Sequence, residues 1–473
     1  MSAPATDSAA ARATALLQSL RHPHGRQAAI AGLRGSDTGK AAGLAGAMIA
    51  NNVIALVSTV VFARELTDYG SLGALISYLL ILTVAGQAMQ VATAREGVLG
   101  HLGLGDKLIA TTRSWTRTMM IVTGVLAVVS VLLRQPIADA VGVKHYPWAA
   151  AFGIPAGCLY LEVSLLRGAL QGVGDYKSVG LSLIGEQGAR LIGGAILAIP
   201  FSVTGAYIGS LISYIAMSLY CIVQLNRYAV AHHAETAPPS DIPPGAAVSL
   251  WKHVQRAGAP IAGLVVIAVL QNIDIIAAKH RFGSHAATSY AAVAVAAKVL
   301  IWVAIGAGFY LVPEVSRRRA AGLDTRSVLF KALGIVLVCA VPVLLIFGGA
   351  SHLLIKSVFG ASKSGASDAL FPLGLAFSVL ACTYLAIQYM LALKHTWFLV
   401  VVGAVAVAEP ILLIHASRKP SAFAFTVLGV QAAAAIVAFG FALRREKAPP
   451  SSPADPDAAE GEPIALAASV QVD

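Results

Sequence analysis

Charged residues are scarce in this chain of 473 residues. They make up 12% of it, whereas apolar residues make up 57%. A soluble domain carries roughly 25% charged residues, so the charge present here is too little to cover a surface that faces water. This shortage excludes a soluble globular protein. Lipid has to cover the surface instead, and we expect an integral membrane protein.

Sequence motifs for enzymatic chemistry are also missing. The nearest approach to a nucleotide-binding P-loop is Gly39-Lys40, but Ala41 follows it and Arg34 stands where the first glycine belongs. No His-Glu-x-x-His sequence occurs, and the four cysteines lack the spacing of metal ligands. The loops expected on the outer side are short, which argues against a membrane-embedded glycosyltransferase. We therefore expect no enzyme, no cofactor and no metal.

The apolar residues are gathered in long runs that are separated by short polar segments. A helix needs ~20 apolar residues to cross a bilayer, and twelve runs have about this length. They cover residues 41–63, 71–94, 116–134, 147–167, 178–199, 203–224, 256–279, 286–313, 328–350, 367–392, 395–415 and 421–443. The pattern predicts an all-α polytopic membrane protein with about 12 transmembrane helices.

Basic residues are distributed unevenly over the loops between these runs. With a cytoplasmic N-terminus, most of the 34 Lys and Arg residues lie on the cytoplasmic side, including the row 317–319. The positive-inside rule therefore predicts a protein of the inner, cytoplasmic membrane with both termini in the cytoplasm. The net charge of +11 follows from this topology and from anionic lipid. It does not indicate a nucleic-acid partner.

Similar short polar motifs recur at equivalent positions in the two halves of the chain. Tyr69-Gly70-Ser71 after the first run matches Phe282-Gly283-Ser284 after the seventh, and Thr112-Arg113-Ser114 matches Thr325-Arg326-Ser327 at the same offset. Parallel repeats of this kind are typical of transporters, and they predict two six-helix bundles around a central cavity. The expected divisions are a cytoplasmic arm (1–40), an N-terminal bundle (41–224), a cytoplasmic linker (225–255), a C-terminal bundle (256–443) and a disordered cytoplasmic tail (444–473).

Two stretches carry a family resemblance. Residues 60–80 (VVFARELTDYGSLGALISYLL) resemble the first loop of polysaccharide-export flippases, where a basic segment leads into an aromatic-Gly turn. Residues 165–197 are similar to the junction of the fourth and fifth spans in that family, with its Arg-Gly-x-Leu-Gln-Gly hinge. Over residues 40–443 the chain resembles the multidrug/oligosaccharidyl-lipid/polysaccharide (MOP) exporter superfamily, and within it the Wzx-like flippases.

The resemblance implies a flippase that moves a polyprenyl-diphosphate-linked oligosaccharide to the outer leaflet by alternating access. It implies membrane lipids and this lipid-linked substrate as partners, together with a polysaccharide polymerase or glycosyltransferases of cell-envelope synthesis. Such a diphosphate head group is anionic, so its path through the membrane needs fixed cations and polar groups.

Few cations lie inside the predicted spans, where a charge costs about 2.5–3.5 kcal/mol. Arg190 follows Glu186 by one turn in the fifth span, and Lys298 lies in the middle of the eighth. Both are candidates to bind the diphosphate, Arg190 through paired N–H donors. The alternatives are an ion pair of Arg190 with Glu186, and pairing with Asp274 or snorkelling for Lys298. Arg64, at the outer end of the first span, is either a cavity residue or an interfacial anchor.

Polar residues of the first and seventh spans form a second candidate group, because these spans are equivalent in the repeat. They either line the cavity and bind substrate or form interhelical hydrogen bonds, worth about 0.6 kcal/mol each. A buried carboxylate can titrate near neutral pH, so we expect Asp274 and Glu186 as sites for a coupling ion or proton. The polar candidates are Asn51, Asn52, Gln271 and Asn272.

Two other functions stay open. A cation-coupled multidrug exporter of the same superfamily shares the expected topology. Many such exporters have an acid in the first span, however, and here that span has no carboxylate before Glu65. The second alternative is a membrane scaffold for cell-envelope synthesis, which does not transport. A scaffold predicts that charge changes at Arg190 and Lys298 are silent.

Overall fold

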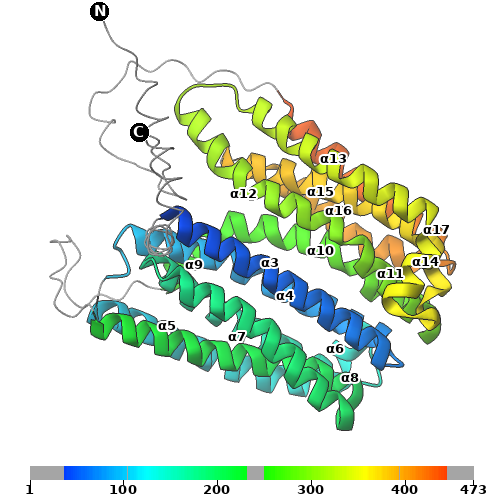
Figure 1. The fold of residues 1–473 in the computed structure, drawn as a ribbon, viewed down its shortest axis with the longest axis horizontal. Helices are drawn as coiled ribbons and strands as arrows, with labels where there is room; N and C mark the ends of the chain where they lie inside the picture. Colours follow the sequence, from blue (N-terminus) through cyan, green and yellow to red (C-terminus); the bar gives the residue numbers. More distant parts are fainter. Residues whose placement is uncertain (1–36, 104, 232–249, 394, 445–473) are drawn as a thin grey trace, which may run out of the picture.

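Helices are the only regular elements in the described part of the chain (Figure 1). The structure, a computed structural model, describes residues 37–103, 105–231, 250–393 and 395–444. Most of the expected arm, the centre of the expected linker and nearly all of the expected tail lie outside these residues. Eleven helical stretches are long and apolar enough to cross a membrane. The predicted all-α polytopic membrane fold is confirmed.

Apolar side chains face outward along these helices. Ile199, Val338 and Ile436 are 87%, 75% and 74% exposed. Soluble monomers rarely expose large contiguous apolar patches, whereas hydrocarbon is a suitable environment for such a surface. The exposed apolar side chains therefore agree with the shortage of charge in the composition.

The N-terminal bundle is built around the pair α4 and α7, which pack along each other. Helix α3 begins inside the expected arm, and α6 is a short helix in an expected outer loop. The bundle comprises α3 (Asp37–Glu65), α4 (Tyr69–Val98), α5 (Asp106–Leu132), α6 (Arg134–Val141), α7 (Pro147–Gly172) and α8 (Tyr176–Ala231).

Helix α8 makes two crossings. Its 56 residues would extend roughly 84 Å as one straight helix, far more than a hydrocarbon core of ~30 Å. The backbone leaves the helical region at Ser202, where φ is 48°, directly after the Pro200-Phe201 pair. Beyond this turn the second arm returns along the first, and Gly209 lies against Gly194. The hairpin completes the 12 predicted crossings.

The C-terminal bundle is centred on α15, which packs against α12, α13 and α17. Helices α11 and α12 are separated only by a break at Lys298 and form one crossing. The elements are α9 (Leu250–Arg256), α10 (Gly258–Arg281), α11 (Ser284–Ala297), α12 (Val299–Ala320), α13 (Arg326–Gly349), α14 (Ser351–Phe359), the 3-10 helix η1 (Ala361–Ala369), α15 (Leu370–Ala392), α16 (Phe398–His415) and α17 (Pro420–Ala442).

The expected irregular linker contains ordered helix at both ends, which differs from the prediction. Helix α8 continues to Ala231, and α9 begins at Leu250. His253 of α9 is buried, its Nε2 lies 2.9 Å from Oγ1 of Thr93, and its ring stacks on Trp115 at 5.4 Å. Packing on the N-terminal bundle thus stabilises α9. Local sequence could not show this, because Thr93 precedes His253 by 160 residues.

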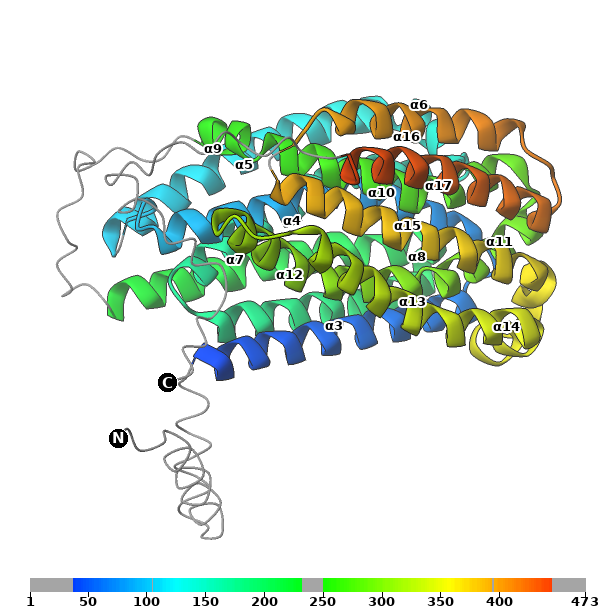
Figure 2. The same ribbon diagram turned by 90° about the horizontal axis from the view of Figure 1, so that it is seen from above.

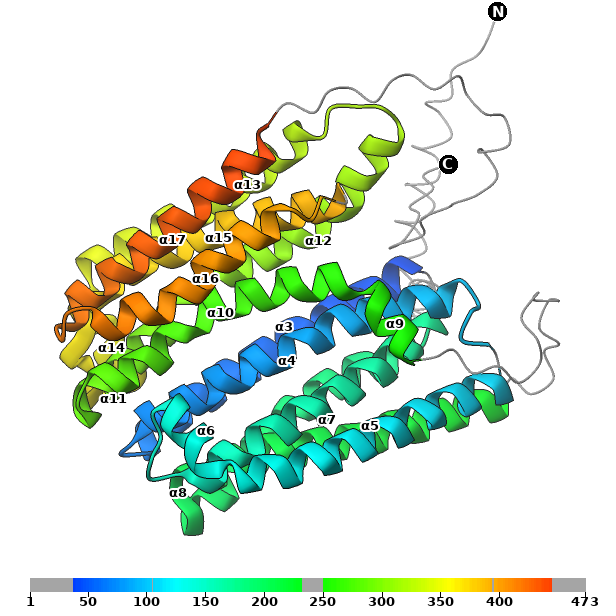
Figure 3. The same ribbon diagram turned by 180° about the vertical axis from the view of Figure 1, so that it is seen from behind.

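The two bundles lie side by side and splay apart toward one end (Figures 1 and 3). The start of α3, the end of α17 and helix α9 are at the splayed end, while α6, α11 and α14 come together at the opposite end. Seen from above, α3 and α16 lie on opposite sides of the molecule (Figure 2). Both ends of the described chain are therefore on one side, as an even number of crossings requires.

The α8 hairpin gives a test of the fold. A Cβ atom at Gly209 would lie 2.5 Å from the backbone N of Gly194, and backbone cannot move aside cheaply. Gly209→Ala should cost about 1–3 kcal/mol through overpacking and lower the melting temperature of the detergent-solubilised full chain. Gly188→Ala in the first arm is the control, because nothing lies within 4 Å of its Cβ position. Equal stability of the two variants would contradict the hairpin.

Candidate functional site

A buried ion pair joins α7 to the first arm of α8. An Nη1 atom of Arg167 lies 2.8 Å from Oε2 of Glu186, and both side chains are buried. Arg167 also donates through Nε to Oγ of Ser182 (2.8 Å) and through Nη2 to its carbonyl oxygen (2.9 Å). These contacts compensate the charge of Arg167 within the bundle. Arg167 is the last residue of the predicted span 147–167, and α7 continues beyond it to Gly172.

Arg190, one turn beyond Glu186, is not part of this pair. Within the described residues no hydrogen bond or ion pair reaches its side chain, which is half-buried. Its charge acts on the hydroxyl groups of three buried tyrosines from α4 and the second arm of α8. The hydroxyl of Tyr207, one of these three, has no hydrogen-bond partner in the described chain. The neighbouring tyrosines are Tyr69, Tyr207 and Tyr214.

Three of the predicted site residues of the C-terminal bundle meet in one buried network. Lys298 Nζ lies 3.2 Å from Oδ1 of Asp274 and 3.5 Å from Oδ1 of Asn272. Tyr290 donates its hydroxyl to Oδ2 of Asp274 at 3.2 Å, and Lys298 Nζ is 5.4 Å from the centre of the Phe377 ring. The structure thus shows the pairing with Asp274 that was one of the two alternatives for Lys298.

A second carboxylate extends this network toward α16 and α17. Glu409 is fully buried, and its Oε1 accepts a hydrogen bond of 3.1 Å from Nε2 of Gln431. Its electrostatic neighbours are Asp274 and Lys298. The other oxygen of Glu409, Oε2, has no hydrogen-bond partner among the described residues. Burial of a polar atom without a hydrogen bond is costly, so Glu409 is an unusual residue for the core of a bundle.

At the unsplayed end, cations of each bundle bind helix-end carbonyls of the other. Arg64, at the end of α3, donates to the carbonyl oxygens of Ser357 (2.6 Å) and Val358 (2.9 Å) in α14. Lys363 of η1 is buried and donates to the carbonyl of Leu66 at 3.2 Å. Both contacts place a positive charge at the negative end of a helix dipole, where it is stabilised.

An ion pair and a close backbone contact complete this set, which we call the outer clasp. Lys279 Nζ of α10 lies 2.8 Å from Oδ1 of Asp68, which precedes α4. The amide of Gly70 donates to Oγ1 of Thr288 at 3.0 Å, and a Cβ at Gly70 would lie only 2.9 Å from the Thr288 backbone. The outer clasp comprises Arg64, Asp68 and Gly70 of one bundle and Lys279, Thr288, Ser357, Val358 and Lys363 of the other.

The charge of Asp68 is stabilised in the closed clasp. Burial alone would raise the pKa of Asp68, but hydrogen bonds from Lys279 and Ser71 favour the carboxylate and bring its pKa below the usual value. A carboxyl with a lowered pKa contributes stability above its unfolded pKa and loses it as the pH falls through the lower, folded value. The carboxyl group of Asp68 is therefore ionised at neutral pH.

Asn51, Asn52 and Gln271 are not brought into these groups. Asn51 and Asn52 lie at the middle of α3, half-buried and exposed respectively, with a hydrogen bond of 3.3 Å between their side chains. Gln271 is half-buried, while its neighbour Asn272 is buried and donates to the carbonyl of Ala268. The predicted group of the first and seventh spans is thus divided between the two bundles.

Several polar residues of these networks were not predicted as site residues. Arg167 stands in the Arg-Gly-x-Leu-Gln-Gly stretch, and Glu409 directly precedes Pro410, so both had a local signal. Asp68 and Lys279 had a weaker one, because Asp68 follows the first predicted span and Lys279 ends the equivalent seventh span. No local pattern connects Gln431 to Glu409, which lies 22 residues earlier.

Solved structures show which fold this is, although no family model and no curated sequence matches the chain. It is similar to an inward-facing multidrug resistance MATE family transporter of the MOP superfamily (TM-score 0.66, 13% identity, covering 83% of this chain and 93% of the other). It is also similar to the lipid II flippase MurJ in an inward closed conformation (TM-score 0.63, 14% identity, covering 84% and 87%). The chain therefore shares the fold of these two solved proteins.

The conformations of these neighbours differ in their similarity to the chain. An outward-facing MATE family transporter matches with a TM-score of 0.51, at 14% identity and covering 87% of this chain and 96% of the other. The inward-facing one reaches 0.66.

The ion pair of the outer clasp can be tested by measuring the separation of the bundles at that end. Asp68→Asn should increase the population with separated outer ends about two- to fivefold, the range expected for a partly exposed ion pair. Nitroxide labels at Lys144→Cys and Lys419→Cys, in a chain whose native cysteines are replaced by alanine, report the distance. Glu65→Gln removes a neighbouring exposed acid and is the control; an equal effect of both variants would exclude the pair.

The same labels test the pH dependence of the clasp. Because the pKa of Asp68 is lowered, acidification should separate the outer ends only below the usual aspartate pKa. Between pH 7 and pH 5, on the usual aspartate scale, the distance distribution should stay constant. A transition inside that interval would show that Asp68 is not held as a carboxylate by Lys279.

Proposed function

We propose that this chain, which has the fold of the MOP exporter superfamily, is a flippase for a lipid-linked oligosaccharide. It would move a polyprenyl-diphosphate carrier with its sugar from the inner to the outer leaflet of the cytoplasmic membrane by alternating access. The observation that carries this proposal is Arg190, a half-buried cation within a span that contacts no carboxylate in the described chain. Both termini are assigned to the cytoplasm by the positive-inside rule.

Charge balance distinguishes Arg190 from the other intramembrane cations. Arg167 contacts Glu186, and Lys298 contacts Asp274, so each of these cations has its counter-charge in the protein. A guanidinium group at this depth is costly without an anion. The diphosphate of the carrier supplies one, and it matches the paired donors of a guanidinium.

The network of the C-terminal bundle supports a coupling role more than direct substrate contact. Lys298 already contacts Asp274, and Glu409 adds a second acid to the same buried site. Uptake or loss of a cation or proton there changes the charge balance that holds α10 to Lys298 and to α16. We therefore assign Asp274 to coupling, together with Lys298. Glu186 is assigned to compensation of Arg167 instead.

The outer clasp serves as the gate in this proposal. The closed clasp keeps the outer ends of the bundles together while the splayed, cytoplasmic end receives the head group. Opening toward the outside requires the Asp68–Lys279 pair and the Arg64 contacts to break. Opening also has to separate apolar side chains of α4 from α10 and α11. The cargo therefore has to bind the open state more tightly than the closed one.

A cation-coupled multidrug exporter is the second candidate. It is favoured by the similarity to the MATE family transporter and by the acid excess at Asp274 and Glu409. It is disfavoured by Arg190, because a cationic drug would be repelled by an uncompensated guanidinium. The two candidates therefore differ in the sign of charge that the N-terminal bundle accepts.

Substitution of Arg190 tests its role as the substrate cation. Arg190→Gln should abolish complementation of a depletion strain at normal expression and thermal stability, since no protein contact is lost. Arg190→Lys should retain partial activity, because the charge stays but the paired donors are lost. Unchanged activity of Arg190→Gln would contradict the proposal.

Arg167 is the matched control, because its role is structural. Arg167→Gln leaves Glu186 buried without a counter-charge and should destabilise the protein by about 3–5 kcal/mol. The double variant Arg167→Gln with Glu186→Gln removes both charges and should recover much of the expression and activity. Loss of activity in the stable double variant would show that this pair, too, is functional.

The cargo itself is identified by mass spectrometry of membrane lipids after depletion of the protein in its host. A flippase predicts accumulation of a polyprenyl-diphosphate oligosaccharide and loss of the matching surface polymer. An unchanged lipid-linked pool with increased sensitivity to cationic drugs would support the exporter instead. A scaffold predicts that Arg190→Gln complements the depletion fully.

A further inference from the structure

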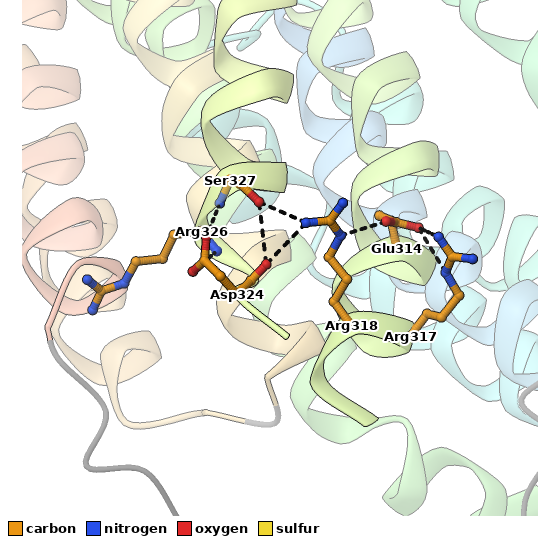
Figure 4. A network of polar contacts seen from close by, with 6 residues as sticks. All are labelled: Glu314, Arg317, Arg318, Asp324, Arg326 and Ser327. Carbon is orange, nitrogen blue, oxygen red and sulfur yellow. Dashed lines mark hydrogen bonds and ion pairs between the residues drawn. The ribbon is translucent and has the colours of Figure 1, made fainter. Parts of the chain in front are cut away.

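A basic surface lies where α12 meets α13, at the splayed end of the C-terminal bundle. Arg317, Arg318 and Arg319 end α12, and Arg326 begins α13 (Figure 4). Arg444, the last described residue, adds a fifth guanidinium group to the same end. We call these five arginines the basic surface.

Acidic residues next to the basic surface compensate only part of its positive charge. Glu314 contacts both Arg317 (2.8 Å) and Arg318 (2.7 Å) (Figure 4). The carboxylate of Asp324 accepts from the backbone amides of Arg326 and Ser327, at 3.1 and 3.2 Å, and so caps α13.

The other three arginines of the basic surface have no carboxylate partner in the described chain. The guanidinium of Arg319 donates to the carbonyl of Leu393, and that of Arg326 donates to two carbonyls at the end of α17. Arg444 packs over the ring of Phe441, at 4.9 Å. Each keeps its net positive charge, so this end of the bundle attracts anions.

The chain leaves α17 directly on this surface. Arg326 Nη2 donates to the carbonyl oxygens of Leu443 (3.3 Å) and Arg444 (2.9 Å). These contacts fix the starting point of the residues that follow Arg444. Whatever the tail carries is therefore presented beside the basic surface at a high local concentration.

The tail carries the opposite charge. From residue 448 to residue 473 it has no Lys or Arg, and four of its carboxylates fall within eight residues. These four are Asp455, Asp457, Glu460 and Glu462. We propose that this acidic segment, 455–462, binds the basic surface formed by the α12–α13 turn and the end of α17.

Both the distance along the chain from Arg444 and the negative charge allow the acidic segment to bind the basic surface. The acidic segment begins 11 residues after Arg444, and a chain of this length can reach at most roughly 36–40 Å from that residue. Single exposed ion pairs are weak, so binding depends on several pairs and on the tether, which gives an effective concentration on the order of millimolar. The docking is therefore sensitive to salt, and it does not depend on which cargo the protein moves.

Photo-crosslinking in the full chain tests the proposal. A benzophenone amino acid replaces Leu323, an exposed residue of the α12–α13 turn, and the protein is placed singly in phosphatidylcholine nanodiscs. After illumination, mass spectrometry should find tail peptides linked to this position. The quadruple variant Asp455→Asn, Asp457→Asn, Glu460→Gln and Glu462→Gln should reduce the linked fraction at least fivefold. It leaves every described residue unchanged.

Two controls establish that charge directs the contact. A probe at Ser114, which is exposed on α5 beside Arg113 and Arg117, samples basic residues of the other bundle and should give little linked tail. Salt at about 1 M, where the Debye length is about 3 Å, should reduce linking at Leu323 to the level of the neutral variant. Equal linking by the native and neutral tails, or equal linking at Ser114 and Leu323, would overturn the proposal. If phosphatidylglycerol nanodiscs alone abolish linking, the tail still binds this surface, in competition with anionic lipid.

Discussion

The cost of an uncompensated charge in hydrocarbon governs the interior of this protein. Each bundle buries one cation against a carboxylate from another part of the chain, Arg167 against Glu186 and Lys298 against Asp274. The first pair connects α7 with α8, and the second connects α10 with the break between α11 and α12. Because a buried charge without a partner is strongly destabilising, these pairs restrict how the helices can rotate against each other. The packing of both bundles depends on them.

Arg190 differs from these two cations, because no carboxylate of the described chain contacts it. Our proposed function depends on this difference. The position of Arg190 is set by the α8 hairpin, in which the two arms approach closely at Gly194 and Gly209. No carboxylate of the described chain contacts its side chain. A site of this kind is stable when an anion completes it, and the anion comes from the cargo in our proposal. The two bundles are thus alike in topology and different in charge balance.

Polar contacts also distinguish the closed end of the molecule from the splayed end. Contacts of the outer clasp use the negative ends of helix dipoles and one carboxylate, and they add to the apolar packing of α4 against α10 and α11. Interactions of this strength are exchangeable with water. A gate has to be stable enough to exclude leakage and weak enough to open, and polar contacts at helix ends meet both conditions.

Local patterns predicted much of the architecture. Twelve apolar runs predicted 12 crossings, and even the two runs within α8 were separated correctly at Ser202, because run length and a Pro-containing turn are local properties. The structure brings only some of the predicted site residues together. Lys298, Asn272 and Asp274 meet in one network, whereas Asn51 and Asn52 lie apart from it. Glu186 binds Arg167, which no spacing along α8 could indicate, because the partner belongs to a different helix.

Composition and periodicity by themselves determined that this chain is an all-helical membrane protein of two similar halves, since the bilayer imposes span length and apolarity on each segment separately. Only the tertiary structure decided which charges are compensated, where the bundles are fastened together and that α9 packs on the first bundle. Those features depend on contacts between residues far apart in the chain, such as Asp68 with Lys279. Helix packing brings such residues together, and no single segment encodes its own partner.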